Sequence, residues 1–175
     1  MRDDAPDHVD ELRQQWAREL PDLDTSPMTT LGRVYRLAQL VAPAIEQNFA
    51  AFGLDRGEFD VIGTLRRSGP PYCLTPTELY RSLMIASGSL THRLARLEKM
   101  RLVHRRRNEN DGRSLVVELT RKGQQLAEQA FRGDMELEAA LLEDLDAASR
   151  TRFAADLKRV TAALEVRLRA LAPNR

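Results

Sequence analysis

Basic side chains are concentrated between residues 91 and 113 of this 175-residue chain. The whole chain is nearly neutral, with 27 Lys and Arg against 26 Asp and Glu. The basic stretch alone has a net charge of +5, so the remainder stands at −4. Such segregation is typical of a surface that binds a polyanion, and a charged face that is merely solvated is the alternative. The basic members of the stretch are Arg93, Arg96, Lys99, Arg101, Arg105, Arg106, Arg107 and Arg113.

Two short helices joined by a tight turn are predicted where this stretch begins. Thr75-Pro76-Thr77-Glu78 is a capping box with proline at the first helical position, which predicts a helix over 76–83. Ser87 is the expected N-cap of a second helix, which runs over 88–100. This pattern is typical of a helix-turn-helix. The residues of the second helix that are expected to face inward are Leu90, Leu94 and Leu97.

A basic β-hairpin is predicted directly after the second helix. Two strands, 102–106 and 114–119, flank the turn signal Asn110-Asp111-Gly112. A helix-turn-helix with such a hairpin is a winged helix. The predicted fold class is therefore mainly α with a small β-hairpin, built around a winged helix-turn-helix DNA-binding domain.

Double-stranded DNA is the partner that this arrangement predicts, because the second helix can enter the major groove and contact base edges there. Arg113, beside the hairpin turn, is placed for the narrow minor groove, and Asp111 can hold it extended. Arg106 and Arg107, at the base of the hairpin, are expected to contact phosphates. The expected contacts from the second helix are Ser87, Ser89, Thr91, His92 and Arg96.

Three further helices are predicted on the N-terminal side. The first covers 7–20, with Asp7 or Asp10 as its N-cap. In the second, which continues to Gly53, Ser26-Pro27 supplies the N-cap and first helical residue, and Pro43 predicts a kink or break near 39–43. A capping box, Asp55-Arg56-Gly57-Glu58, opens the third helix.

Apolar helices are also expected on the C-terminal side, where Thr120 caps a helix that begins at residue 121. The segment 134–146 contains six acidic and no basic residues, and a last helix covers about 148–171. These apolar faces exceed what a winged helix needs, which predicts a dimer interface. The expected organisation is an extra N-terminal helix (1–25), dimerisation helices (26–53 and 121–175) and a winged helix-turn-helix domain (54–120).

No enzymatic signature is found, because the chain lacks a phosphate-binding glycine loop, a nucleophile elbow and a metalloprotease motif. Cys73 lies in a Pro-rich loop and cannot form an internal disulfide, so we expect a plain small residue there. His8, His92 and His104 lack metal-ligand spacing. With neither a signal peptide nor an apolar span, the chain is expected to be a cytoplasmic protein without a cofactor.

Three segments resemble the MarR family of bacterial transcription regulators: Ser89 to Arg105, the hairpin tip Asp111 to Ser114, and Leu119 to Gly123. The resemblance covers residues 28–170. Gly112 stands where the family usually has a charged residue, and Met100-Arg101 replaces its usual glycine. The resemblance implies an obligate homodimer with interleaved terminal helices that binds a pseudo-palindromic operator, usually as a repressor.

The N-terminal extension, with Trp16, resembles the urate-responsive HucR/PecS branch of the family. This resemblance implies that urate or a related purine binds to Trp16, Asp60, Arg93 and Arg105. Urate is a flat monoanion, so an indole can stack on it and a guanidinium can pair with it. We expect Asp60 to pair with one of the two arginines until the anion competes for it and moves the recognition helix. Other stretches shared with the branch are Glu58-Phe59-Asp60, Ser68 to Pro71, Leu74 to Leu79 and Ser87-Gly88.

Several alternatives remain for these residues. Trp16 could be ordinary core packing, Asp60 a structural cap or pair, and the two arginines could contact phosphates instead. The effector could be another anionic or phenolic ligand, or Cys73 could sense oxidants. In a different class, a winged-helix adaptor would bind a protein through the acidic segment 134–146. DNA binding should weaken steeply with salt, with a flatter slope when Arg113 is replaced, whereas adaptor binding should not.

Overall fold

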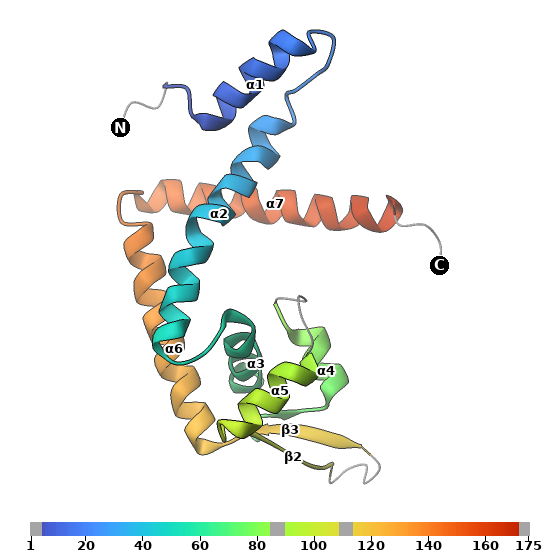
Figure 1. Ribbon diagram of the computed structural model, residues 1–175, viewed down its shortest axis with the longest axis vertical. Coiled ribbons are helices and arrows are strands. Elements are labelled where there is room, and N and C mark those ends of the chain that lie inside the picture. The colour runs from blue at the N-terminus through green and yellow to red at the C-terminus, as the bar shows by residue number, and fades with distance from the viewer. Residues whose placement is uncertain (1–4, 85–89, 109–113, 172–175) are drawn as a thin grey trace. The chain divides into compact units, whose positions relative to one another are not determined.

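A computed structural model describes residues 5–84, 90–108 and 114–171. Within these ranges it contains seven helices and three short strands, which confirms the predicted mainly helical fold (Figure 1). The chain divides into two compact units that meet within α6, between Phe131 and Arg132. In chain order the elements are α1 (His8–Glu19), α2 (Met28–Ala51), α3 (Arg56–Arg67), β1 (Cys73–Leu74), α4 (Pro76–Ser82), α5 (Leu90–Lys99), β2 (Val103–Arg107), β3 (Leu115–Leu119), α6 (Arg121–Leu141) and α7 (Ala147–Leu171).

The helix-turn-helix consists of α4 and α5, which both pack on α3 (Figure 1). The inward stripe predicted for α5 is confirmed, since Leu94 and Leu97 are buried and Leu90 is half-buried. Burying these leucines supplies the main free energy that holds the recognition helix on its support. They share one core with buried residues of α3, α4 and the sheet, namely Val61, Ile62, Leu65, Leu79, Leu102, Val117 and Leu119.

The predicted hairpin strands are present as β2 and β3, and a third strand, β1, extends the sheet in the antiparallel order β1-β3-β2. The expectation that Cys73 lies in a loop is wrong, because Cys73 pairs with Glu118 across β1 and β3. A two-residue strand is too short to show alternation in the sequence, and its pairing is with a segment far along the chain. The predicted turn over 110–112 lies outside the described residues.

The helix starts agree closely with the capping signals in the sequence. Asp7, Asp55 and Thr75 each accept a hydrogen bond from a backbone N–H of the first helical turn and complete the capping boxes of α1, α3 and α4. At the start of α6, the N–H of Gly123 donates to Oγ1 of Thr120 at 3.0 Å. These caps satisfy N–H groups that have no partner within the helix.

Helix α2 differs from the sequence prediction in two respects. It begins at Met28, and Pro27 occupies the N-cap position without a side-chain cap, so Ser26 does not serve as the N-cap. The sequence predicts a kink or break near 39–43. The structure contains no break there, because α2 continues through Pro43 to Ala51. Proline removes a single helical hydrogen bond. Burial of Ile45 and Phe49 beyond it keeps the last turns of the helix in place.

The N-terminal helix α1 is docked on the first turns of α2. Val9 is buried, and its side chain lies so close to Gly32 that a Cβ there would come within 3.0 Å of it. Arg33 donates to Asp7 at 2.8 Å and to Asp10 at 2.7 Å, which ties the start of α1 to α2. Trp16 is 50% exposed, so in the single chain it is not a core residue.

The docking of α1 is expected to weaken in acid. The backbone N–H of Asp10 and the Arg33 guanidinium hold the pKa of Asp7 below its usual value. A carboxylate with a lowered pKa stabilises the docked state at higher pH, and this contribution is lost as the pH falls through the lowered pKa. Fluorescence of Trp16, the single tryptophan, should therefore report undocking only below about pH 4. In an Arg33→Gln variant Asp7 loses its guanidinium partner on α2, so docking should be weaker at neutral pH and this acid transition should be lost; an unchanged transition would contradict this account.

Arg101, the second residue after the end of α5, has a left-handed backbone with φ of 60°. Its N–H donates to the carbonyl of Glu98, and that of Leu102 donates to Leu97, so the bend ends the helix. A side chain is disfavoured in this conformation, and glycine is not. Arg101→Gly should raise the free energy of unfolding by about 0.5–1 kcal/mol, measured by urea denaturation. An equal gain in Arg121→Gly, a replacement in the first turn of α6, would show that the backbone argument is wrong.

The unit after residue 131 contains the end of α6 and the predicted last helix, found at Ala147–Leu171. None of the residues of α7 is buried in the single chain. Large apolar side chains are exposed along it, including Phe153, Leu164, Val166, Leu168 and Leu171. Among the described residues, no helix combines the length and apolarity needed to cross a membrane.

Candidate nucleic-acid interface and effector site

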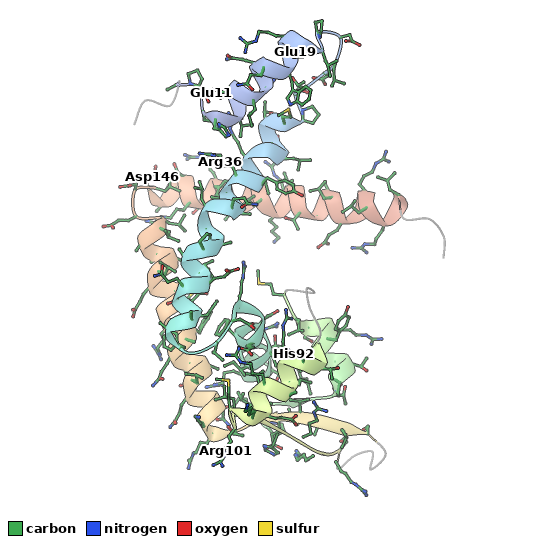
Figure 2. All side chains as sticks on the ribbon, viewed as in Figure 1. Glu11, Glu19, Arg36, His92, Arg101 and Asp146 are labelled. Carbon is green, nitrogen blue, oxygen red and sulfur yellow. The ribbon has the colours of Figure 1, made fainter. Side chains whose placement is uncertain are left out.

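The outer face of α5 presents hydrogen-bonding side chains to solvent. Thr91 and His92 are exposed, and Figure 2 labels His92 on this helix. Lys99 is exposed two turns after His92, on the same face, and was not among the predicted contacts, although the spacing of seven residues signals it. Ser87 and Ser89 lie outside the described residues.

Arg96, the remaining predicted contact from this helix, turns back toward α3. Its Nη1 donates to Oε2 of Glu58 at 2.6 Å, and its Nη2 lies 3.4 Å from the carbonyl oxygen of Gly53. Glu58 is 1% exposed, whereas the Arg96 side chain is 48% exposed. The guanidinium is thus engaged by the start of α3 on one side and open to solvent on the other.

The basic strand β2 carries the predicted phosphate contacts. Arg107 is exposed at its end, whereas Nε of Arg106 donates to Glu118 on β3. His104 lies 3.6 Å from the same Glu118 carboxylate. Arg106 is therefore held against the sheet, and Arg107 is the more accessible of the two. Arg113 lies outside the described residues.

Arg93, one of the four predicted effector residues, lies where α5 packs on α3. The Arg93 guanidinium lies against Gly57, where an added Cβ would be 2.3 Å from Cζ of Arg93. Asp60 is half-buried on α3, one turn after Gly57, which places it beside this contact. Arg105, on β2, pairs with Glu98 of α5 at 3.2 Å. Both arginines thus link the recognition helix to a neighbouring element.

A cavity of about 560 Å³ adjoins Arg93, between the end of α2 and the start of α3. Small-molecule sites in proteins commonly have this size. The lining of the cavity includes acidic and basic side chains, apolar Ala50 and Leu54, and Gly57, which has no side chain. An anion with an apolar ring face could thus find a guanidinium here. The charged lining residues are Glu46, Asp55, Arg56 and Arg93.

Trp16 does not reach this cavity within the same chain. Val9 contacts α2 at Gly32, and the cavity is lined by Ala50, so these points are about 27 Å apart at a rise of about 1.5 Å per residue. Trp16 lies about 10 Å along α1 from Val9, whatever the direction of that helix. The Trp16 backbone is therefore more than about 15 Å short of the cavity along α2, which is farther than an indole side chain extends.

Among the described residues, no group of three or more His, Cys, Asp or Glu side chains is arranged so that it could hold a metal ion. Cys73 is a half-buried free thiol, and its Sγ is 3.9 Å from Nη2 of Arg106. The described side chains instead form a polar and basic face over α5 and β2.

The fold and this face define a winged helix-turn-helix regulator of transcription. The chain belongs to the MarR family. Residues 52–114 match the model of that family. The HTH-type transcriptional regulator PecS of Dickeya dadantii (strain 3937) is 36% identical over 152 residues, which cover 87% of this chain and 92% of the relative.

Other relatives agree with this assignment. The multiple antibiotic resistance protein MarR of Salmonella typhimurium is 31% identical over 119 residues, covering 67% of this chain and 81% of the relative. The crystal structure of a mutant MarR from E. coli complexed with operator DNA has a TM-score of 0.64 and 26% identity, and covers 83% of this chain and 96% of that one. The predicted family and fold class are thereby confirmed.

Proposed function

We propose that this chain is a cytoplasmic, homodimeric repressor that binds a pseudo-palindromic operator, and that urate or a related purine attenuates this binding. The observation that carries the DNA-binding part is the exposed face of α5 beside the basic strand β2 on a winged-helix scaffold. A MarR relative has been crystallised with operator DNA, which supports the same use of this face.

In this proposal the two parts of the face have different tasks. Thr91 and His92 on α5 contact base edges or nearby phosphates in the major groove, together with Ser87 and Ser89. Arg107 and Arg106 contact phosphates at the base of the wing, and Arg113 enters the minor groove. Lys99 adds a phosphate contact at the end of α5.

Selection of duplexes from a random-sequence library should yield a pseudo-palindromic site, whose affinity is then measured by fluorescence anisotropy at increasing KCl. Arg107→Gln should lower the slope of log affinity against log salt by about 0.9 for each half-site, because one phosphate contact is lost. Arg152→Gln, an exposed arginine on α7, is the matched control and should leave the slope unchanged. Failure to select any duplex, with tight and salt-insensitive binding to a protein instead, would favour the adaptor alternative.

The homodimer is supported by apolar surface that the single chain leaves exposed. Leu12 and Trp16 are exposed on α1, Leu20 at its C-cap, and Leu31 and Tyr35 on α2. Helix α7 buries none of its residues. Exposed apolar surface on this scale marks an interaction site. A second copy of the chain, with helices from both termini interleaved, would cover it.

The effector proposal rests on the cavity beside Arg93 and on the position of Trp16. The guanidinium of Arg93 offers a partner for the urate anion, and Asp60 is half-buried on α3 one turn after Gly57, against which Arg93 lies. Because Trp16 of the same chain is too far away, we assign the stacking indole to the second protomer. A bound anion competes with Asp60 for Arg93 and shifts the recognition helix away from its DNA-binding position.

Mobility-shift titrations test the effector directly. Urate should release the selected duplex at concentrations that leave the protein folded, and xanthine serves as the related purine. Complexes that ignore both compounds up to millimolar concentrations would remove the urate assignment and leave DNA binding intact. Release by hydrogen peroxide that is lost in Cys73→Ser would instead favour the oxidant-sensor alternative.

A further inference from the structure

The pairing of Arg96 with Glu58 joins the recognition helix to the first turn of α3. Oε2 of Glu58 accepts from Nη1 of Arg96 at 2.6 Å and from the backbone N–H of Asp55 at 2.9 Å. The guanidinium also lies 3.9 Å from the carboxylate of Asp55 and near the carbonyl oxygen of Gly53. We refer to Arg96, Glu58, Asp55 and Gly53 as the Arg96 clamp.

Burial makes this contact different from a surface ion pair. The carboxylate of Glu58 is 1% exposed, and it is one of few buried acidic side chains among the described residues. A buried charge is tolerated when it is paired and hydrogen-bonded, and it becomes costly when its partner is removed. Loss of Arg96 would thus leave Glu58 without its cation, and the start of α3 would have to move or take up water.

The position of Arg96 on α5 gives the clamp its function. Arg96 belongs to the outer flank of α5, which the sequence predicts to face DNA, but its side chain leads back to α3. We propose that Arg96 is a positioning residue, which fixes the angle of α5 on α3 so that Thr91 and His92 can reach the major groove. This inference rests on the proposed DNA-binding function.

The same turn of α3 also receives Arg93, one helical turn earlier on α5. Gly57 leaves room for the Arg93 guanidinium, and the next residue, Glu58, binds Arg96. The cavity is lined by Asp55 and Arg93, so a ligand in it would act on the turn that the clamp holds. The clamp is thereby placed to transmit a shift at Arg93 to the angle of the recognition helix.

Replacing a positioning residue and replacing a DNA-contacting residue change the affinity for DNA and its salt dependence in different ways. Loss of a phosphate contact lowers the salt slope by about 0.9, and loss of a base contact removes discrimination at one position. Loss of positioning weakens binding at an unchanged salt slope and without loss of preference at any single base. Replacing the partner that a positioning residue binds should weaken DNA binding in the same way.

The experiment compares Arg96→Gln, Glu58→Gln and the double variant on the duplex selected by the wild-type protein. Glutamine at position 58 retains an oxygen for the capping box but removes the charge. Each single variant should weaken binding about tenfold at an unchanged salt slope, and the double variant should be no more than about twofold weaker than either. Arg107→Gln is the contrasting control, because its salt slope should fall. Circular dichroism confirms that all variants are folded at the temperature used.

Two results would overturn the clamp. One is a lower salt slope, or lost discrimination at one base, in Arg96→Gln while Glu58→Gln binds normally. The other is additivity of the two replacements in urea unfolding without DNA, where the clamp requires coupling. If the wild-type protein selects no duplex, the DNA-binding proposal fails, and the unfolding cycle still decides whether the clamp exists.

Discussion

Gly123→Ala should lower the free energy of unfolding by about 3 kcal/mol, the largest effect that we expect from a single methyl group in this chain. An added Cβ at Gly123 would lie 2.1 Å from the carbonyl oxygen of Leu102 and 2.7 Å from a methyl group of Leu119. The carbonyl belongs to the backbone and accepts from the N–H of Thr120 at 2.9 Å. It cannot move without loss of the contact between the start of α6 and β2.

Gly63→Ala provides the matched control for this replacement. Gly63 lies within α3, and an added Cβ would be 3.4 Å from the ring of Phe59, which is ordinary contact. Alanine is favoured over glycine inside a helix, so this variant should be as stable as the wild type or about 1 kcal/mol more stable. Urea unfolding at one fixed protein concentration measures both, because the stability of the proposed homodimer depends on concentration. Equal stability of the two variants would refute the close-approach argument.

Local signals in the sequence located most of the fold. The capping boxes that begin at Asp55 and Thr75, and the N-cap signal at Asp7, predicted helix starts that the structure contains, because each signal involves residues within one turn. Strand β1 could not be predicted in this way. Its two residues pair with Val117 and Glu118, more than forty positions along the chain, and only the tertiary fold brings them together.

The candidate site shows the same division between local and distant information. The helical period placed Arg96 on the outer flank of α5, but it could not reveal a buried carboxylate thirty-eight positions earlier in the chain. Likewise, the space that Gly57 leaves for Arg93 depends on how closely α3 and α5 pack. Trp16 was grouped with these residues by family resemblance. The length of α2 then shows that it cannot join them within one chain.

Trp16→Ala should weaken urate binding by about 30-fold, because it removes the stacking surface. DNA affinity should be unchanged, because Trp16 lies outside the DNA-binding face of α5 and β2. Isothermal titration calorimetry with urate measures the first effect and anisotropy with the selected duplex the second. Asp60→Asn provides a contrast, since it should retain urate binding but release DNA less readily, having lost the repulsion of the anion. Tyr80→Ala, which removes an exposed aromatic side chain from α4, serves as control and should bind urate normally.

Mixed dimers determine whether the indole is supplied in trans. Homodimers of Trp16→Ala and of Arg93→Gln should both bind urate weakly, since each damages both sites. The two variants are then combined in a heterodimer assembled from differently tagged chains. If each site takes Trp16 from one protomer and Arg93 from the other, both replacements fall in one site and the second site is intact. Calorimetry should then show one site per dimer with wild-type affinity. Sites formed within one chain would give none, which would contradict the separation of about 27 Å that α2 imposes between the α1 contact at Gly32 and the cavity at Ala50.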